Sequence, residues 1–416
     1  MFFHRVHIEK PRDFAILACA VKIGQSERMV STRTLAISML DEALRLHRPP
    51  ETMHLPGSLA DSDVRFVRAM VLNTLRHVGQ IDVLLARQME KPLAPSKHWL
   101  LCALRLGVAQ LICMQIAPHA AIGETVQAVR ESKHKALAGL VNAVLHNIAP
   151  ESALPAVETN LPQWLWARWG EWYGKPRTAQ YCALASVQPP IDILYRDGTQ
   201  KRVSADTEVT KLDGYDAGSW MVQDAAASQC VQLLPEDLRG KTVLEIGAAP
   251  GGKTAQLCWR GAEVTALDRS AKRMERLQEN MQRLQLNPTC VVADALEYTP
   301  DKQFDIVVLD APCSATGTWR RHPEVVHLLT PPQLDELVGL QKNILARAWQ
   351  WVKPGGQLLY MVCSLEQEEG EAQIAQFLQE YKNASPQGAA LRTHPADRAE
   401  DGGMDGFYAA LLLCGL

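Results

Sequence analysis

The stretch Lys241–Thr254, KTVLEIGAAPGGKT, decides how the second half of the chain folds. The apolar, β-branched run Thr242–Ile246 predicts a buried strand, and the turn after it, rich in glycine and proline, leads into a helix. Glycines allow a tight backbone turn, and the helix that starts there offers free N–H groups to an anion or a nucleoside. The stretch therefore predicts a ligand-binding strand–loop–helix.

Two ligands fit this loop. Residues Gly247–Thr254 match the pattern G-x-x-x-x-G-K-T of a phosphate-binding loop. The apolar run Ile306–Asp310 could then be the strand that ends in a Mg²⁺-binding carboxylate. The alternative is a loop for S-adenosyl-L-methionine (SAM), a methyl donor that contains adenosine. The rest of the chain has to decide between a nucleotide hydrolase and a methyltransferase.

Length and composition limit the function classes. The chain has 416 residues, enough for roughly two or three domains. Its net charge of −3 gives no overall basic signature, so a nucleic acid would have to bind local basic faces. No apolar stretch is long enough to cross a bilayer.

Cysteine usage favours a reducing, cytoplasmic compartment. The 10 cysteines contain no CxxC pair and no Cys/His pattern at zinc spacing, so no metal site is expected. Eight of them lie in apolar or helical surroundings and are expected to be buried: Cys19, Cys102, Cys113, Cys182, Cys230, Cys258, Cys290 and Cys414.

From Gln223 onward, predicted strands alternate with predicted helices, which indicates a doubly wound, mainly parallel α/β sheet. The strands are expected at Val243–Ile246, Glu263–Asp268, Cys290–Ala293, Phe304–Leu309 and Gln357–Cys363. The helices are expected at Thr254–Trp259, Ala271–Leu284, Pro331–Val352 and Gln367–Tyr381. Ligands of such sheets bind at the carboxyl ends of the strands.

Polar residues at these strand ends favour the SAM loop. Asp268 comes about twenty residues after the glycines, where a carboxylate accepts hydrogen bonds from a ribose diol. Asp294, after the next strand, could hold an adenine amino group. Asp310 is followed by Pro312 and Cys313, and a carboxylate that binds Mg²⁺ has no use for a cysteine there. An enzyme that methylates a flat base does have such a use.

A second thiol follows another strand, at Cys363. Ser364 and Gln367 fit a capping box, which predicts a helix that starts at Ser364 and a dipole that favours the Cys363 thiolate. Two thiols beside a methyl donor suggest methylation at carbon 5 of cytosine. A thiolate adds to carbon 6, and the activated ring then takes the methyl group. A base removes the carbon-5 proton so that the thiolate can leave.

The first half of the chain predicts other segments. Residues 1–28 have no clear periodicity and are expected to be a poorly ordered extension, whereas residues 29–150 repeat apolar positions at helical spacing and indicate an all-α bundle. Residues 151–218 contain a tryptophan-rich helix and short strands, and we expect a small α+β connector whose tryptophans pack internally. The catalytic domain is expected at residues 219–416.

Four motifs carry a resemblance to a known family. They are AAPGGKT (248–254), DAPCSATG (310–317), RRHPE (320–324) and VCS (362–364). The set resembles the RNA 5-methylcytosine methyltransferases, and the segments 119–129 and 139–148 resemble the helical RNA-binding domain of NusB type. The resemblance implies a Rossmann-like, SAM-dependent methyltransferase domain behind a NusB-like domain. It also implies an RNA substrate, with 16S rRNA expected and tRNA as the alternative.

The resemblance also implies roles for individual residues. Cys363 is the expected nucleophile and Cys313 the thiol that assists release, although a Pro-Cys pair by itself would point to Cys313. Trp319, Arg320 and Arg321 are expected near the target base, because arginine binds phosphate and aromatic rings stack on splayed bases. The expected SAM contacts are Gly247, Ala248, Ala249, Pro250, Gly251, Gly252, Lys253, Asp268, Asp294 and Asp310.

The chain departs from the family pattern at three points. Glu245-Ile246-Gly247 stands where Asp-Leu-Cys is usual, and Val362 stands where Thr is usual. An expected Arg-x-Asn element is present only as YRDG (195–198), where we expect altered substrate contacts without loss of the chemistry. Two other functions stay open. A P-loop NTPase would bind ATP through Lys253 and Mg²⁺, and a non-catalytic RNA-binding factor would bind RNA without SAM.

Overall fold

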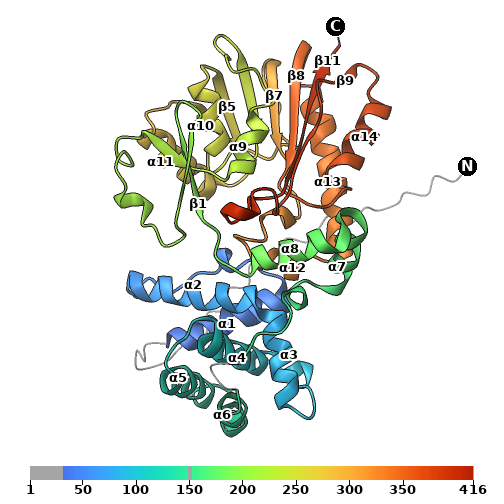
Figure 1. The fold of residues 1–416 in the computed structure, drawn as a ribbon. Helices are drawn as coiled ribbons and strands as arrows, with labels where there is room; N and C mark the ends of the chain where they lie inside the picture. The colour runs from blue at the N-terminus through green and yellow to red at the C-terminus, as the bar shows by residue number, and fades with distance from the viewer. Residues whose placement is uncertain (1–30, 149–151, 416) are drawn as a thin grey trace, which may run out of the picture.

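The computed structural model describes residues 31–148 and 152–415, so the expected extension 1–28 lies outside the described residues. Figure 1 shows an all-helical bundle at one end of the molecule and a β-sheet flanked by helices at the other. The predicted fold class, an α/β domain behind a helical domain, is confirmed. None of the described helices is long and apolar enough to span a membrane.

The bundle forms because its helices carry apolar stripes that face a common interior. That core contains Leu40, Val71 and Leu104, all of them buried. The Ser31 side chain caps the first helix by accepting a hydrogen bond from the Thr34 backbone N–H. The helices of the bundle are α1 (Thr32–Leu46), α2 (Asp61–Arg76), α3 (Val78–Gln88), α4 (His98–Val108), α5 (Pro118–Arg130) and α6 (Ala138–His146).

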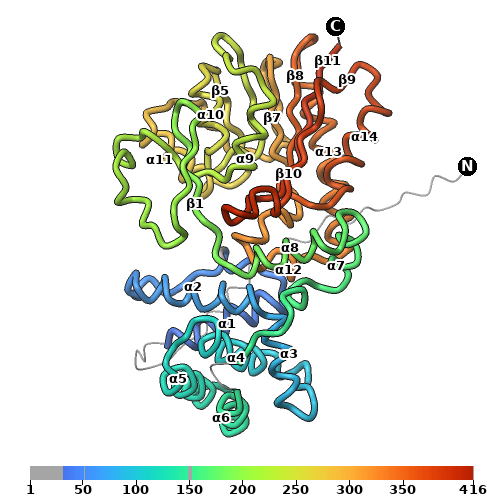
Figure 2. The backbone as a smooth tube through the Cα atoms, viewed as in Figure 1, coloured from blue at the N-terminus to red at the C-terminus, as the bar shows by residue number. Residues whose placement is uncertain are grey.

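Two helices and a small sheet connect the bundle to the large sheet. They are α7 (Gln163–Trp169), α8 (Lys175–Ala185), β1 (Ile191–Tyr195), β2 (Gln200–Val203) and β3 (Trp220–Val222). The small sheet is antiparallel with the order β2-β1-β3, and the tube in Figure 2 runs from α8 directly into β1. Trp169 is fully buried and packs against Tyr181 and Trp319, so packing rather than base stacking is confirmed for this tryptophan.

The large sheet has the strand order β10-β11-β8-β7-β4-β5-β6, and β9 pairs with β11. Strands β4 to β8 run parallel to their neighbours, as predicted, whereas β9, β10 and β11 form an antiparallel edge that the alternating pattern did not predict. The strands are β4 (Thr242–Ile246), β5 (Glu263–Asp268), β6 (Thr289–Val292), β7 (Phe304–Asp310), β8 (Val352–Val362), β9 (Ala384–Pro386), β10 (Leu391–Thr393) and β11 (Phe407–Cys414).

Helices cover both faces of this sheet. In β7, Ile306 and Val308 join one apolar core while Val307 and Leu309 join the other, because successive side chains of a strand point to opposite faces. These helices are α9 (Ala225–Val231), α10 (Gly252–Trp259), α11 (Ala271–Arg283), α13 (Pro331–Trp349) and α14 (Glu371–Glu380). The short helix α12 (Val325–Leu328) instead packs beside α7, where Val326 shares a core with Trp169.

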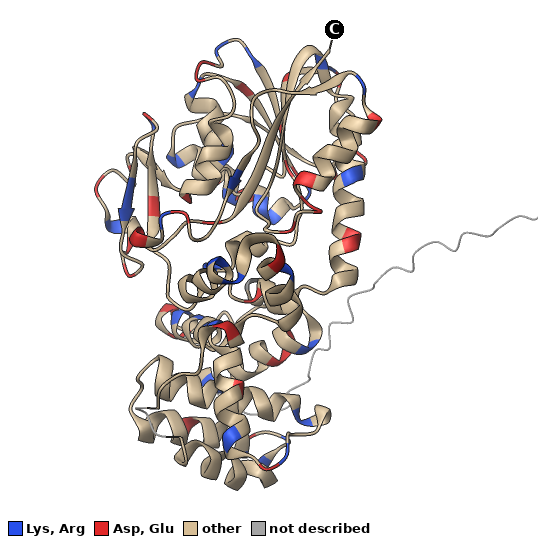
Figure 3. Cartoon of the chain, turned by 45° about the vertical axis from the view of Figure 1, so that its right-hand side comes forward, with Lys and Arg blue, Asp and Glu red and all other residues tan. Residues whose placement is uncertain are grey.

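Hydrogen bonds fasten the bundle to the α/β part. Arg76, at the end of α2, donates to the carbonyl oxygens of Ala185, Val187 and Arg320 at 2.6, 3.0 and 2.8 Å. Burial lowers the pKa of this guanidinium to about 10, so it stays charged at neutral pH. In the view of Figure 3, basic and acidic residues are interspersed over both parts, which agrees with the small net charge of −3.

Candidate active site at the strand ends

The glycine loop lies directly against the end of β7. Gly247 and Gly251 have positive φ angles of 78° and 101°, which favour glycine. A Cβ atom on Gly247 would meet the carbonyl oxygen of Asp310 at 2.4 Å. The residue that departs from the usual pattern, Gly247, therefore allows the loop and β7 to touch.

A cavity of about 340 Å³, which we call the loop cavity, opens over this loop. Ala248–Lys253 line it together with Asp310, and Tyr215, Asn280 and Arg283 complete the wall. Lys253 and Asp310 are ion-paired, with Nζ 2.8 Å from Oδ2. Burial lowers the pKa of Lys253, whereas the paired Asp310 carboxylate raises it. The net pKa is raised, so this lysine stays charged.

The side chains around the loop do not suit a phosphate loop. Such a loop needs a free Ser or Thr hydroxyl for Mg²⁺, but the fully buried Thr254 donates its hydroxyl to Glu245 at 2.6 Å. Burial raises the pKa of Glu245 to about 8, so this acid holds its proton at neutral pH. Lys253 is engaged by Asp310. The geometry therefore opposes the NTPase alternative.

The other two predicted carboxylates do not line the loop cavity. Asp268 is buried at the end of β5, where it accepts hydrogen bonds from the backbone N–H groups of Ala249 and Ser270 at 3.2 and 2.9 Å. Arg273 lies 3.5 Å from the same carboxylate. Asp294 is half-buried after β6, where it accepts from its own turn. Asp268 thus binds the backbone of the glycine loop. Asp268 and Asp294 both stay predicted SAM contacts.

The structure brings the two predicted thiols together. Cys313 and Cys363 follow the adjacent parallel strands β7 and β8, and their Sγ atoms are 3.5 Å apart. The hydrogen bond to Cys363 and burial both raise the pKa of Cys313 well above its usual range. Cys313 therefore keeps its proton and can donate it to the sulfur of Cys363.

Both thiols line a second cavity of about 610 Å³, the thiol cavity. The segment Asp310–Cys313 connects the two cavities, because its first residue lines one and its last residue lines the other. The bundle forms part of the wall through His47 and Pro49. His47, at the end of α1, is hydrogen-bonded through Nδ1 to the carbonyl oxygen of Leu328 at 3.0 Å. Sequence reasoning missed this histidine, because nothing near it in the chain points to the thiols.

Comparison with known proteins matches both halves of the chain. The family model of 16S rRNA methyltransferase RsmB/F matches residues 231–413, and that of the NusB family matches residues 27–150. A ribosomal RNA small subunit methyltransferase B of Xanthomonas campestris is 34% identical, over 94% of this chain and 97% of the relative. One of Yersinia enterocolitica is 32% identical, over 92% and 98%. The chain belongs to the ribosomal RNA small subunit methyltransferase B family.

Solved structures agree on the fold. The crystal structure of PH0851 superposes with a TM-score of 0.71 at 22% identity, covering 91% of this chain and 98% of that one. A methyltransferase homolog protein from Pyrococcus horikoshii gives a TM-score of 0.51 at 21% identity, covering 61% and 95%. The predicted resemblance and the NusB-like domain are confirmed, and SAM is the methyl donor of this RNA methyltransferase.

For this RsmB-family chain, the structure corrects the predicted nucleotide contacts. Arg320 is 1% exposed and lies 3.1 Å from both Asp224 and Asp405, so it cannot reach a base. Trp319 is buried against Trp169. Arg321 pairs with the same two carboxylates. The prediction is wrong for Trp319, which is packed in the core, and for Arg320, which is held by two buried carboxylates distant in sequence. For Arg321, whose side chain is 23% exposed, it stays a prediction.

The predicted helix start beside Cys363 is also wrong. Helix α14 begins at Glu371, seven positions after Ser364, and has Gly370 at its N-cap. The Ser364 hydroxyl does accept a hydrogen bond from the backbone N–H of Glu366 at 2.9 Å, as a cap would, but no helix continues from there. The predicted helix dipole at Cys363 is therefore absent from the structure.

Two of the departures from the family pattern, Val362 and YRDG (195–198), lie in different parts of the structure. Val362 is fully buried at the end of β8, where its side chain serves packing. YRDG (195–198) lies at the turn between β1 and β2 and lines a different hollow, together with Gln256 and Trp259. The altered substrate contacts predicted at this turn stay a prediction.

The cysteines expected to be buried fall into two groups. Cys102, Cys182, Cys230 and Cys414 are buried, whereas Cys113, Cys258 and Cys290 are half-buried. Cys19 lies outside the described residues.

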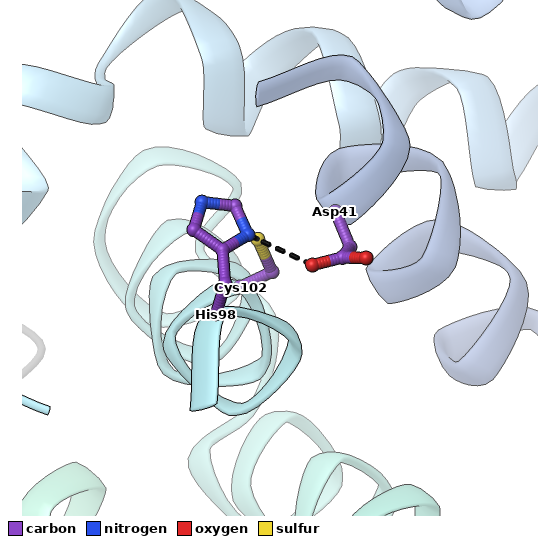
Figure 4. A group of neighbouring side chains, drawn as sticks. All are labelled: Asp41, His98 and Cys102. Atoms are coloured by element: carbon purple, nitrogen blue, oxygen red, sulfur yellow. Dashed lines mark hydrogen bonds and ion pairs between the residues drawn. The ribbon is translucent and has the colours of Figure 1, made fainter. Parts of the chain in front are cut away.

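One group of potential metal ligands lies in the bundle, where the sequence pattern had shown none. Figure 4 shows Asp41 from α1 facing His98 and Cys102 from α4. His98 Nδ1 is 2.8 Å from the Asp41 carboxylate and 3.7 Å from the Cys102 sulfur. However, Arg45 already pairs with Asp41 at 2.9 Å, and burial raises the pKa of Cys102 to about 12. We therefore interpret the group as a buried ion pair and assign no metal to it.

Proposed function

We propose that this chain transfers the methyl group of SAM to carbon 5 of a cytosine in small-subunit rRNA, through a covalent bond between Cys363 Sγ and carbon 6. The observation that carries the proposal is the pair of thiols, 3.5 Å apart, in a cavity whose wall is three residues along the chain from the wall of the loop cavity, at Asp310 and Cys313. The named relatives, which are ribosomal RNA small subunit methyltransferases, support the choice of substrate. A cytoplasmic location is part of the proposal.

The loop residues fit the methyl donor. The backbone of Ala248–Gly252 and the charged groups of Lys253 and Asp310 surround a space of about 340 Å³ at the start of α10. Free N–H groups at a helix start bind a carboxylate such as that of the methionyl part. When bound, SAM supplies an electrophilic methyl group on its sulfonium sulfur.

The thiol geometry supports Cys363 as the nucleophile. Because Cys313 keeps its proton, its S–H group can donate to Cys363 and stabilise a thiolate there. The Cys363 thiolate then forms a bond to carbon 6, and the electron pair of the 5,6 double bond makes carbon 5 nucleophilic.

In this proposal, Cys313 assists the release of the product. After carbon 5 has taken the methyl group, loss of its proton to a base restores the double bond and expels the Cys363 thiolate. The Cys313 thiol, 3.5 Å away, donates its hydrogen bond to the departing sulfur. The target cytosine has to leave its stack to reach these groups, because carbon 6 is attacked from one face of the ring.

The helical bundle is proposed to bind the RNA around this base. His47 and Pro49 belong to the bundle and line the cavity that contains the thiols. RNA held by the bundle therefore lies next to the reacting groups.

The test is methyl transfer from labelled SAM to unmodified 16S rRNA, followed by nucleoside analysis. We expect label in 5-methylcytidine, and no label with the Cys363→Ala variant. Transfer to tRNA but not to rRNA would contradict the substrate. RNA binding without SAM binding would support the non-catalytic alternative.

A further inference from the structure

A buried carboxylate that belongs to neither cysteine motif lies next to both thiols. Glu369 is 0% exposed and lies between the end of β8 and the start of α14. The sequence analysis did not identify Glu369, because the polar residues around it indicate an ordinary exposed turn. Burying a carboxylate costs free energy, so a buried carboxylate is normally stabilised by several hydrogen-bond donors.

The donors come from both cysteine loops. Ser314 directly follows Cys313, and its backbone N–H and its hydroxyl donate to Glu369 at 2.8 and 2.5 Å. Ser364 directly follows Cys363, and its hydroxyl donates to the same carboxylate oxygen as that of Ser314. The two hydroxyl oxygens are 3.0 Å apart. One carboxylate thus ties together two segments that lie 50 residues apart in the chain.

Glu369 is itself held at two points, its carboxylate and its backbone carbonyl. Gln341 of α13 donates to Glu369 at 2.8 Å and to the carbonyl oxygen of Pro312 at 2.9 Å. The Tyr360 hydroxyl of β8 donates to the backbone carbonyl of Glu369 at 2.7 Å. Burial raises the pKa of Glu369, and the hydrogen bonds from the serines oppose that shift. A network in which each member is bonded holds its parts in one geometry.

We infer that Glu369 is a positioning residue, which clamps the two cysteine loops together and so fixes the distance between the thiols. The inference rests on the proposed function, in which Cys313 has to donate to Cys363. Two other bonds join the loops: the Gly317 N–H donates to the Cys363 carbonyl at 3.1 Å, and the Leu365 N–H donates to the Thr316 hydroxyl at 3.0 Å. Glu369 adds the bonds at the residues that directly follow the two cysteines, and a shift of about 1 Å at a reacting group costs about 100-fold in rate. Glu369 touches neither the base nor the methyl donor in this account.

The test replaces the carboxylate by an amide of the same shape. In Glu369→Gln an NH₂ group replaces one of the two oxygens. In the place of Oε1 it faces the Ser314 N–H, which is also a donor, and in the place of Oε2 it cannot accept from the hydroxyls of Ser314 and Ser364. The clamp therefore loses accepted hydrogen bonds in either orientation. We expect kcat for methyl transfer to fall about 100-fold, with the KM for RNA and the Kd for SAM within about twofold of the original values. We also expect the midpoint pH for iodoacetamide alkylation of Cys363, followed by peptide mass spectrometry, to rise.

Glu366→Gln is the matched control. Glu366 is equally buried and three positions away, but it accepts from Arg168 and Trp169 at 2.8 Å each instead of from the serines. Its replacement should change the stability of the protein and leave the midpoint for Cys363 unchanged. If Glu369→Gln does not fold, Ser314→Ala and Ser364→Ala each remove one anchor from the clamp. Each of these two variants should then lower kcat about 10-fold and raise the midpoint pH for alkylation of Cys363.

Two results would overturn the inference. One is a kcat of Glu369→Gln within about twofold of that of the original protein. The other is a fall in kcat with an unchanged alkylation midpoint, which would make Glu369 a merely structural residue. If the original protein methylates no RNA, the proposed function fails, but the midpoint of Cys363 in Glu369→Gln still tests the clamp.

Discussion

The segment Asp310–Cys313 lines the loop cavity at its first residue and the thiol cavity at its last, but the two cavities are otherwise built from different parts of the chain. Residues that line the loop cavity all come from the small sheet and the α/β part. The thiol cavity in addition has a wall from the bundle, at His47 and Pro49. The loop cavity is thus built without the bundle, whereas the bundle contributes to the thiol cavity.

The two cavities also differ in their chemistry. Charged side chains, Lys253, Arg283 and Asp310, line the loop cavity. The thiol cavity contains the two thiols that we propose to react, and the serines that follow them are hydrogen-bonded to the buried Glu369 carboxylate. Variants should therefore separate into those that affect SAM binding and those that affect RNA or the covalent step.

The largest effect is expected from Cys363→Ala. Methyl transfer should fall below detection, because the change removes the proposed nucleophile, while the Kd for SAM stays within about twofold. Calorimetric titration with SAM and transfer of labelled methyl groups measure the two quantities. Cys290→Ala is the control, since this half-buried cysteine lines neither cavity. Retained transfer in Cys363→Ala would remove the nucleophile assignment.

Asp268→Ala should produce the next largest effect, on the loop cavity. The change removes the carboxylate that accepts from the N–H groups of Ala249 and Ser270. We expect the Kd for SAM to rise about 10- to 100-fold, the cost of a charge-assisted hydrogen-bond acceptor. Asp237→Ala, which removes an exposed carboxylate paired with Arg239, should leave it unchanged. An unchanged Kd in Asp268→Ala would exclude this residue from the donor site.

The next effect is a dependence of stability on pH, and it is expected from Glu245, which lies in β4 just before the glycine loop. Burial raises its pKa to about 8, so the folded state binds the proton more tightly than the unfolded state does. The contribution to stability is complete below the unfolded pKa and is lost as the pH rises through about 8. Glu245→Gln lacks this loss, so its unfolding free energy relative to the original protein should increase from pH 5 to pH 8, by at most about 1.4 kcal/mol per pH unit. Urea unfolding at several pH values measures it. A constant difference would contradict the raised pKa.

The smallest effect is expected at the wall that the bundle contributes. His47→Ala should raise the KM for RNA about fivefold and leave the Kd for SAM unchanged, because an exposed contact carries modest binding energy. His146→Ala, an exposed histidine of α6 that lines neither cavity, is the control. A larger Kd for SAM in His47→Ala would show that the two cavities are not independent.

The sequence allowed the parts of the site that are local in the chain to be predicted. Alternating strands and helices placed Asp268, Asp310, Cys313 and Cys363 at the carboxyl edge of one sheet, as the strand pairing confirms. What could not be predicted depends on partners that are distant in sequence. His47 meets Leu328 across 281 positions, and Glu369 meets Ser314 across 55.

The wrong predictions have the same origin. Local patterns made Ser364 look like a helix cap and Arg320 look like a nucleotide contact. In the folded chain the Ser364 hydroxyl is bound by the Glu369 carboxylate, and Arg320 is bound by Asp224 and Asp405. Similarly, nothing local shows that β11, the last strand described, inserts antiparallel between β10 and β8.

The most direct test of the central claim is the covalent adduct of Cys313→Ala with RNA. This variant should still form the bond to carbon 6 but release it poorly, so a denaturation-resistant protein–RNA band should accumulate in the presence of SAM. Digestion and mass spectrometry should then find the methylated cytidine on the peptide that contains Cys363. An adduct that forms in Cys363→Ala and is carried by Cys313 would show that the two roles are reversed.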